Sequence, residues 1–320
     1  MINKKTILLT GFNFKETKNF KKKYKNILFE KYKVKHKYKK NINALVSKNR
    51  GSFNLFYFND LEKFKKDLKW IHISAAGLDI YPKLFLLNNS CKVTNGKIIQ
   101  GPEVADHAMG LLLSLTRKIN YLSKFGLKSS FDYRPIELKD KSILVVGYGG
   151  VGKCIAERSH GFGLKVYAVH NKVKQRSKYV KKFYKREQFK YAIKNKDIIV
   201  FSLPLTSKTK HLYNEKTAKL IKKGAFLINV CRGGVVCEKT LFKYLKNNIL
   251  SGAGVDVLGK NDNLKLYKKF SNFKNFIFTP HIAGISDNLK KRNETLIENN
   301  IKRFSKNQEL INVIDKKDLK

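Results

Sequence analysis

Three glycines stand at the spacing G-x-G-x-x-G in the stretch Gly147–Gly152. A short apolar run, Ile143–Val146, precedes them, and a helical pattern follows. In such a strand–turn–helix unit the first glycine permits a tight turn, the second lets a phosphate approach the backbone, and the third lets the helix pack closely. Free N–H groups at the helix start attract anions. We therefore expect a dinucleotide pyrophosphate to bind Gly147, Tyr148, Gly149, Gly150, Val151 and Gly152.

The strand predicted after this helix, Val166–Val169, ends at His170. Rossmann units that use NAD carry an acidic residue at this point, which binds the ribose 2′-hydroxyl. No Asp or Glu occurs between Lys165 and Arg186. The missing carboxylate removes repulsion of a 2′-phosphate, and nearby cations could hold it. The nearby cations are Lys172, Lys174 and Arg176. We expect His170 to contact the cofactor. We expect NADP(H) as the preferred cofactor, with NAD(H) as the alternative.

Further candidates stand where other predicted strands end. The carboxyl ends of parallel strands meet at one edge of a sheet, and ligands of open α/β sheets bind there. The predicted strands Asp197–Ser202, Ala225–Val230, Ala253–Val257 and Phe276–Thr279 bring to this edge Leu203, Pro204, Arg232, Asp256 and His281.

The elements that must position these residues alternate between strand and helix patterns, which is typical of parallel α/β sheets. A strongly apolar run, Val104–Tyr121, predicts a buried helix. We expect a turn at Val93–Gly96, a helix at Asp287–Ser305 and a short strand at Leu310–Ile314. Earlier strands are predicted at Thr6–Thr10, Ile27–Val34, Ala44–Val46 and Trp70–Ser74, where Trp70 and His72 are interpreted as core residues.

The composition narrows the class of protein. A length of 320 residues indicates about two domains. The net charge of +44 would suit a nucleic-acid binder. However, Lys is spread over nearly every predicted element without a basic tail, so we interpret the charge as a composition bias and expect no specific nucleic-acid partner. No apolar run reaches the ~18 residues of a membrane span. Four scattered cysteines without metal-type spacing indicate reduced thiols, a cytoplasmic location and no metal site.

From Trp70 to Asp315 the chain resembles the D-isomer-specific 2-hydroxyacid dehydrogenase family. The resemblance implies an α/β fold of two Rossmann-like, doubly wound parallel-sheet domains. Residues 1–100 and 286–320 would form a discontinuous substrate-binding domain and 101–285 the dinucleotide-binding domain, with the chemistry in the cleft between them. The motifs, in order, are SAAGLD (74–79), VADHAMGLLLSLTR (104–117), GYGGVG (147–152), SLPLTSKT (202–209), INVCRGGVV (228–236), AGVDV (253–257), TPHIAG (279–284) and LINVID (310–315).

The resemblance also implies roles for single residues. Hydride transfer to a 2-oxo acid needs a cation for the carboxylate, a donor for the ketone and an acid for the new alkoxide. Arg232 fits the first two needs, and His281 fits the third. Backbone N–H groups of Ala75, Ala76 and Gly77 would bind the substrate carboxylate. The cofactor would contact Leu203, Pro204, Thr209, Val230, Cys231 and Asp256, the last on its nicotinamide side.

The third catalytic position departs from the family pattern. Relatives place a Glu five residues after the Asp of the AGVDV motif, where it hydrogen-bonds the histidine. Here that position is Asn261, and Asp262 follows. Asn261 can orient an imidazole but brings no charge. Asp262 could reach the histidine after a small loop adjustment, so both residues stay candidates.

We therefore expect an NAD(P)H-dependent reductase of small 2-oxo acids, of the glyoxylate or hydroxypyruvate type, that forms D-2-hydroxy acids and assembles as a homodimer. A phosphoglycerate dehydrogenase-type activity is the nearest alternative. A non-catalytic dinucleotide-sensing protein is an alternative of another class, which Asn261 favours and the retained Arg232 and His281 oppose.

Overall fold

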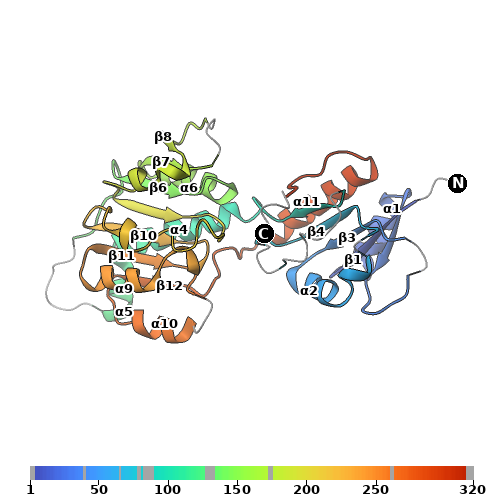
Figure 1. Ribbon diagram of the computed structural model, residues 1–320, viewed down its shortest axis with the longest axis horizontal. Coiled ribbons are helices and arrows are strands. Elements are labelled where there is room, and N and C mark those ends of the chain that lie inside the picture. Colours follow the sequence, from blue (N-terminus) through green and yellow to red (C-terminus); the bar gives the residue numbers. More distant parts are fainter. Residues whose placement is uncertain are drawn as a thin grey trace. The chain divides into compact units, whose positions relative to one another are not determined.

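The computed structural model divides the chain into two compact units. Unit 1 comprises Met1–Ile99 and Ser286–Lys320, and unit 2 comprises Gln100–Ile285 (Figure 1). Gln100 thus belongs to unit 2, one residue from the predicted boundary. The structure describes residues 4–38, 41–64, 66–77, 81, 90–126, 134–171, 176–259 and 263–314.

Unit 1 contains a five-stranded parallel sheet in the order β2-β1-β3-β4-β5. This order is that of a doubly wound sheet, with helices on both faces. Alternation of buried side chains along β4 explains the two faces, since Trp70 packs into one core cluster and Ile71 into the other. The strands are β1 (Lys5–Thr10), β2 (Ile27–Lys31), β3 (Ala44–Ser47), β4 (Trp70–Ile73) and β5 (Lys92–Asn95).

Two sequence predictions in unit 1 are wrong. The expected turn at Val93–Gly96 is mostly the strand β5, whose polar Thr94 is buried and accepts a hydrogen bond from the Trp70 indole at 2.9 Å. The expected strand at Leu310–Ile314 is reduced to one antiparallel bridge between Thr94 and Val313. In both places a pairing partner far along the chain, and not the local pattern, decides the structure.

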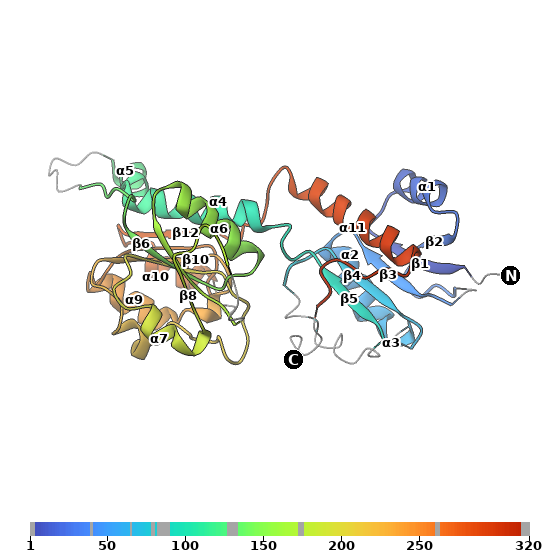
Figure 2. The same ribbon diagram turned by 90° about the horizontal axis from the view of Figure 1, so that it is seen from above.

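The helices of unit 1 cover both faces of its sheet. Helix α11 (Leu289–Ser305) packs on one face through Ile297, Ile301 and Phe304, and it lies along the sheet in Figure 2. Helix α2 (Arg50–Asn59) packs on the opposite face through Phe53 and Phe56. The remaining helices are α1 (Phe14–Lys23) and α3 (Leu61–Phe64).

Unit 2 contains a seven-stranded parallel sheet in the order β12-β11-β10-β9-β6-β7-β8 (Figure 1). Numbered within the unit, this is the Rossmann order with one added strand. The predicted fold class, two doubly wound parallel-sheet units with the first one discontinuous, is confirmed. The strands are β6 (Ser142–Val146), β7 (Lys165–Val169), β8 (Lys182–Tyr184), β9 (Ile198–Phe201), β10 (Ala225–Asn229), β11 (Leu250–Val255) and β12 (Phe276–Phe278).

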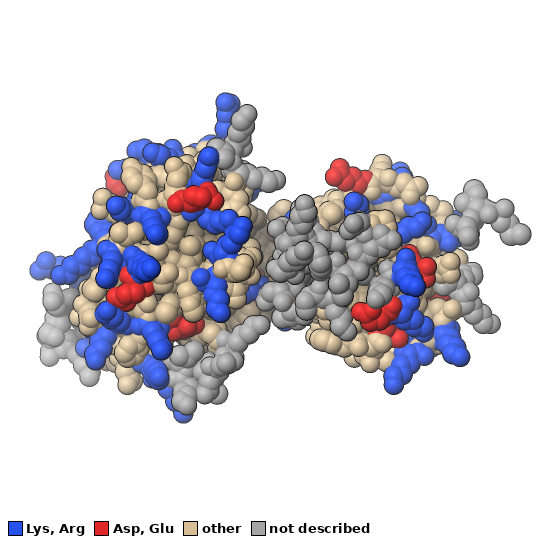
Figure 3. All heavy atoms as spheres, in the orientation of Figure 1, with Lys and Arg blue, Asp and Glu red and all other residues tan. Residues whose placement is uncertain are grey.

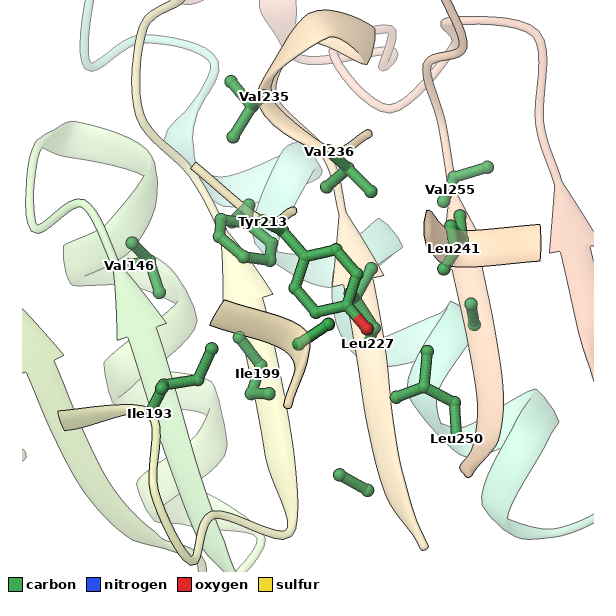
Figure 4. Packing of buried hydrophobic residues seen from close by; sticks show 14 of the residues in the cluster. Val146, Ile193, Ile199, Tyr213, Leu227, Val235, Val236, Leu241, Leu250 and Val255 are labelled. Carbon is green, nitrogen blue, oxygen red and sulfur yellow. The ribbon is translucent and has the colours of Figure 1, made fainter. Parts of the chain in front are cut away.

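Two apolar clusters sandwich this sheet. One cluster joins α4 (Gly101–Thr116) and α6 (Gly150–Gly161) to the sheet. The other contains the buried ring of Tyr213 among aliphatic side chains (Figure 4). The predicted helix Val104–Tyr121 divides into α4 (Gly101–Thr116) and α5 (Ile119–Phe125), because Lys118 has a φ of +63° and interrupts the helix. The other elements are η2 (Arg186–Gln188), α7 (Phe189–Ala192), α8 (Glu215–Ala218), η3 (Gly233–Val235), α9 (Glu238–Lys246) and α10 (Asn263–Phe270).

Lysine and arginine side chains are scattered over the face of each unit that Figure 3 shows, and acidic side chains occur among them. This distribution fits the interpretation of the charge as a composition bias. Among the described residues, no helix combines the length and the apolar character that a bilayer span requires.

Candidate active site

The predicted site residues that follow the strands of unit 2 and are described share one edge of its sheet. All pairings in this sheet are parallel, so the carboxyl ends of its strands lie on the same side. β6 has β7 on one side and β9 on the other, and this reversal of strand order is where open α/β sheets form a ligand crevice. The candidate residues follow the carboxyl ends of these strands. In the spatial order of the strands they are His281 (β12), Asp256 (β11), Val230, Cys231 and Arg232 (β10), Leu203 and Pro204 (β9), Gly147–Gly152 (β6) and His170 (β7).

The glycine turn has the geometry of a phosphate cradle. Gly147 has a φ of +102°, and a Cβ there would lie 2.8 Å from the Ser202 carbonyl oxygen. A Cβ on Gly152 would lie 1.9 Å from the Gly147 oxygen, so only glycine allows α6 to start this close to the turn. A Cβ on Gly149 would meet nothing within 4 Å. Helix α6 begins without a side-chain cap, which leaves the N–H groups of its first turn for an anion.

The side chain of Tyr148 is part of the core. It is 3% exposed, packs edge-on against Phe183 with 4.9 Å between ring centroids, and donates a hydrogen bond to Ser177 Oγ at 2.8 Å. The buried phenol therefore holds the turn against the core. A ligand would contact the backbone of Tyr148, Gly150 and Val151 and not the Tyr148 side chain.

His170 closes the end of β7. Its N–H donates to the Tyr184 carbonyl at 3.0 Å, and its ring stands edge-on to Tyr148 at 6.4 Å between centroids. The residue at the end of β7 is therefore a histidine, where Rossmann units that use NAD carry an acidic residue. Lys172 lies outside the described residues, while Arg176 is described and exposed.

Thr209 shapes the loop that follows β9. Its hydroxyl donates to the Pro204 carbonyl at 2.7 Å and accepts the Thr206 N–H at 2.7 Å, and the residue is 5% exposed. Leu203 lies against the glycine turn, since its Cβ would be 2.8 Å from a Cβ on Gly147. The loop therefore borders the cradle, with Thr209 as its internal brace.

Asn229, which sequence reasoning did not single out, fixes the loop after β10. Its amide nitrogen donates to the Arg232 carbonyl at 3.1 Å, and its oxygen accepts the Cys231 thiol at 3.1 Å. Burial raises the pKa of the Cys231 thiol to about 11, so this thiol stays protonated at neutral pH. Arg232 is half-buried and donates from Nη1 to the Cys231 carbonyl at 2.7 Å. Val230 is buried beside them at 9% exposure.

Asp256 holds the loop that carries His281. Its carboxylate is 1% exposed and accepts the Thr279 hydroxyl at 2.6 Å, the Ile282 N–H at 3.0 Å and the Ala283 N–H at 3.0 Å. The family resemblance implies that Asp256 contacts a nicotinamide. This contact stays a prediction, because the hydrogen bonds that the structure shows for the carboxylate come from its own loop.

His281 is exposed and adopts the left-handed conformation, with a φ of +58°. Its N–H donates to the carbonyls of Asp256 at 2.8 Å and Thr279 at 2.9 Å. A non-glycine residue in this region costs about 1–3 kcal/mol and persists where the surroundings enforce it. These backbone hydrogen bonds thus fix the loop, and the side chain of His281 is exposed. Asn261 and Asp262, the candidate partners of this imidazole, lie outside the described residues.

The loop after β4 in unit 1 holds the predicted substrate-binding residues. The Ala75 N–H donates to the Ile73 carbonyl at 2.8 Å, so this donor is already engaged. Asn95 Nδ2 donates to the Ala76 carbonyl at 2.6 Å. Within the described part of the chain, the N–H groups of Ala76 and Gly77 have no acceptor. Asn95 fell in the wrongly predicted turn, which concealed its position at a strand end.

Comparison with known proteins agrees with this arrangement. Residues 109–283 match the model of the D-isomer specific 2-hydroxyacid dehydrogenase, NAD binding domain. The chain belongs to this family. A glyoxylate reductase of Thermococcus litoralis is 32% identical over 78% of this chain and 77% of its own length. A glycerate dehydrogenase of Methylorubrum extorquens is 30% identical over 71% and 73%, respectively.

Among solved structures, the D-mandelate dehydrogenase of Rhodotorula graminis superposes with a TM-score of 0.84 at 21% identity, covering 98% of both chains, which shows the shared fold. The predicted family and enzyme class, an NAD(P)-dependent 2-hydroxyacid dehydrogenase, are confirmed. The roles of single residues and of the two units stay predictions.

Proposed function

We propose that this enzyme reduces small 2-oxo acids of the glyoxylate or hydroxypyruvate type to D-2-hydroxy acids and prefers NADPH. The observation that carries the proposal is the spatial order at the edge of the unit 2 sheet, where Arg232, Asp256 and His281 follow one another on β10, β11 and β12 beside the glycine cradle on β6. The names of the two relatives, a glyoxylate reductase and a glycerate dehydrogenase, support the substrate class.

The cradle residues fit a nicotinamide dinucleotide. The open side of Gly149 and the uncapped start of α6 would hold the pyrophosphate, and the loops at Leu203, Pro204 and Val230 would flank it. When bound, the reduced dinucleotide supplies the hydride. An imidazole at His170, in place of a carboxylate, supports the preference for NADPH because no negative charge at this strand end repels a 2′-phosphate.

Two side chains and one loop would act on the substrate. The Arg232 guanidinium presents a planar fork that can hold the carboxylate and polarise the ketone oxygen. His281 in its protonated form would give its proton to that oxygen as the carbon gains hydride, which leaves a neutral imidazole and a hydroxy acid. The N–H groups of Ala76 and Gly77 would bind the carboxylate as well.

The experiment is oxidation of NADPH and of NADH against glyoxylate, hydroxypyruvate, pyruvate, oxaloacetate and phosphohydroxypyruvate, for the native enzyme and for the variants His281→Ala and Arg232→Ala. We expect each variant to lose about 10²–10⁴-fold in kcat/KM, the usual contribution of a positioned acid or oxyanion donor. His211→Ala is the matched control. His211 is also exposed and has a φ of +49°, but it does not follow the carboxyl end of a strand.

Turnover on none of the acids, with dinucleotide binding retained, would instead support a non-catalytic sensor. Comparable kcat/KM values with NADH and NADPH would refute the cofactor preference alone. Selective turnover of phosphohydroxypyruvate would refute the substrate class and favour the phosphoglycerate dehydrogenase-type activity.

A further inference from the structure

A chain of three polar side chains runs from helix α4 to the loop of His281. His107 Nε2 lies 2.8 Å from Thr279 Oγ1, and Thr279 Oγ1 lies 2.6 Å from Asp256 Oδ1. The same nitrogen is 3.6 Å from Asp256 Oδ1. Asp256 is 1% exposed, and the His107 side chain is 21% exposed. The chain therefore begins near the surface of unit 2 and ends on a buried carboxylate.

The direction of these hydrogen bonds follows from the groups involved. A carboxylate only accepts, and a threonine hydroxyl has one proton. At 2.6 Å from Asp256, that proton belongs to the bond with the carboxylate. The Thr279 oxygen must then accept from His107, so His107 carries a proton on Nε2. The order is therefore donor His107, relay Thr279 and acceptor Asp256.

We propose that His107 is a positioning residue for His281, acting through Thr279 and Asp256. Thr279 stands two residues before His281, and Asp256 also binds the N–H groups of Ile282 and Ala283 just after it. The carboxylate thus clamps the loop on both sides of the strained His281, and His107 orients the hydroxyl that completes the clamp. This inference rests on the proposed function in assigning His281 the role of acid.

Helix α4 is a suitable anchor for such a contact. It packs on the sheet and on α6 through buried apolar side chains. His107 is a polar residue within this apolar helix, and its reach to Thr279 spans 172 residues of sequence. The alternative is that His107 merely fills space, in which case an apolar ring of similar size would serve equally well.

The test compares His107→Phe, which keeps a planar ring but removes the donor, with His107→Gln, whose amide nitrogen can replace Nε2. Thr279→Val and Thr279→Ser form a second matched pair. We expect His107→Phe and Thr279→Val to lower kcat about tenfold, while His107→Gln and Thr279→Ser stay within about twofold of the native enzyme. Dinucleotide affinity, measured by fluorescence titration, should change less than about twofold in all four.

A second readout does not depend on turnover. In ¹⁵N-labelled protein, the His107 imidazole should carry its proton on Nε2, and the amide signals of Ile282 and Ala283 should shift in His107→Phe but not in His107→Gln. Equal kcat values for His107→Phe and His107→Gln would overturn the proposal, as would unmoved amide signals in His107→Phe. If the native enzyme reduces none of the 2-oxo acids, the proposed function fails, while the amide signals still decide whether His107 orders the loop.

Discussion

The buried histidine His72 should make unit 1 unstable in mild acid. Its ring lies in β4 with 0% exposure, and Nδ1 is 2.9 Å from the Thr94 hydroxyl. The other ring nitrogen, Nε2, is buried and has no hydrogen-bond partner among the described residues. Burial lowers the pKa of His72 from 6.5 to about 3, because a charged imidazole cannot be hydrated there. The folded state therefore keeps this ring neutral.

The sign and the magnitude follow from proton linkage. In the unfolded chain His72 binds a proton below its ordinary pKa of 6.5, whereas the folded chain does not bind one until the pH approaches 3. Above pH 6.5 His72 is neutral in both states and does not lower the free energy of unfolding. As the pH falls from 6.5 toward 3, the free energy of unfolding declines. The slope is about 1.4 kcal/mol per pH unit, so the loss at about pH 5 amounts to about 2 kcal/mol.

Trp70 provides a selective assay, since it is the single tryptophan of the chain and lies in unit 1 at 6.3 Å from His72 between ring centroids. Urea unfolding followed by its fluorescence at about pH 7.5 and about pH 5 reports on this unit. We expect His72→Leu to remove about 2 kcal/mol of the difference between the two conditions. His36→Leu is the control, because His36 is exposed and is the other histidine of unit 1. An unchanged difference in His72→Leu would refute the reasoning.

Three further predictions concern unit 2. Gly152→Ala should lower the free energy of unfolding by about 3 kcal/mol or prevent folding, whereas Gly149→Ala should keep the thermal midpoint and weaken NADPH binding about tenfold, measured by thermal unfolding and titration. His170→Asp should lower the ratio of kcat/KM for NADPH over NADH by about 100-fold; an unchanged ratio would contradict the assignment of this strand end. The Cys231 thiol, with its pKa raised to about 11, should resist a thiol reagent at about pH 8 until the protein is unfolded; rapid native labelling in wild type that Cys231→Ser abolishes would contradict it.

Much of the fold could be predicted from local sequence patterns. The apolar runs predicted the strands of the unit 2 sheet from β6 to β12 apart from β8, because a buried parallel strand is a short continuous apolar segment. The polar β5 escaped this criterion, since Lys92 and Thr94 carry no apolar period and the strand exists through its pairing with β4. Helix α2 was missed as well, because its apolar residues Leu55, Phe56, Tyr57 and Phe58 are consecutive and show no helical period.

The sequence by itself determined the family, the glycine cradle and the candidates Arg232 and His281, because these depend on residue types at fixed spacings and on strand ends. Tertiary structure decided what supports them. The contact of His107 with Thr279 joins residues 172 positions apart, and the clamp of Asp256 on the His281 loop needs two adjacent strands. Such contacts leave no local period in the sequence, since each arises where separate elements pack and most buried polar groups find a hydrogen-bond partner.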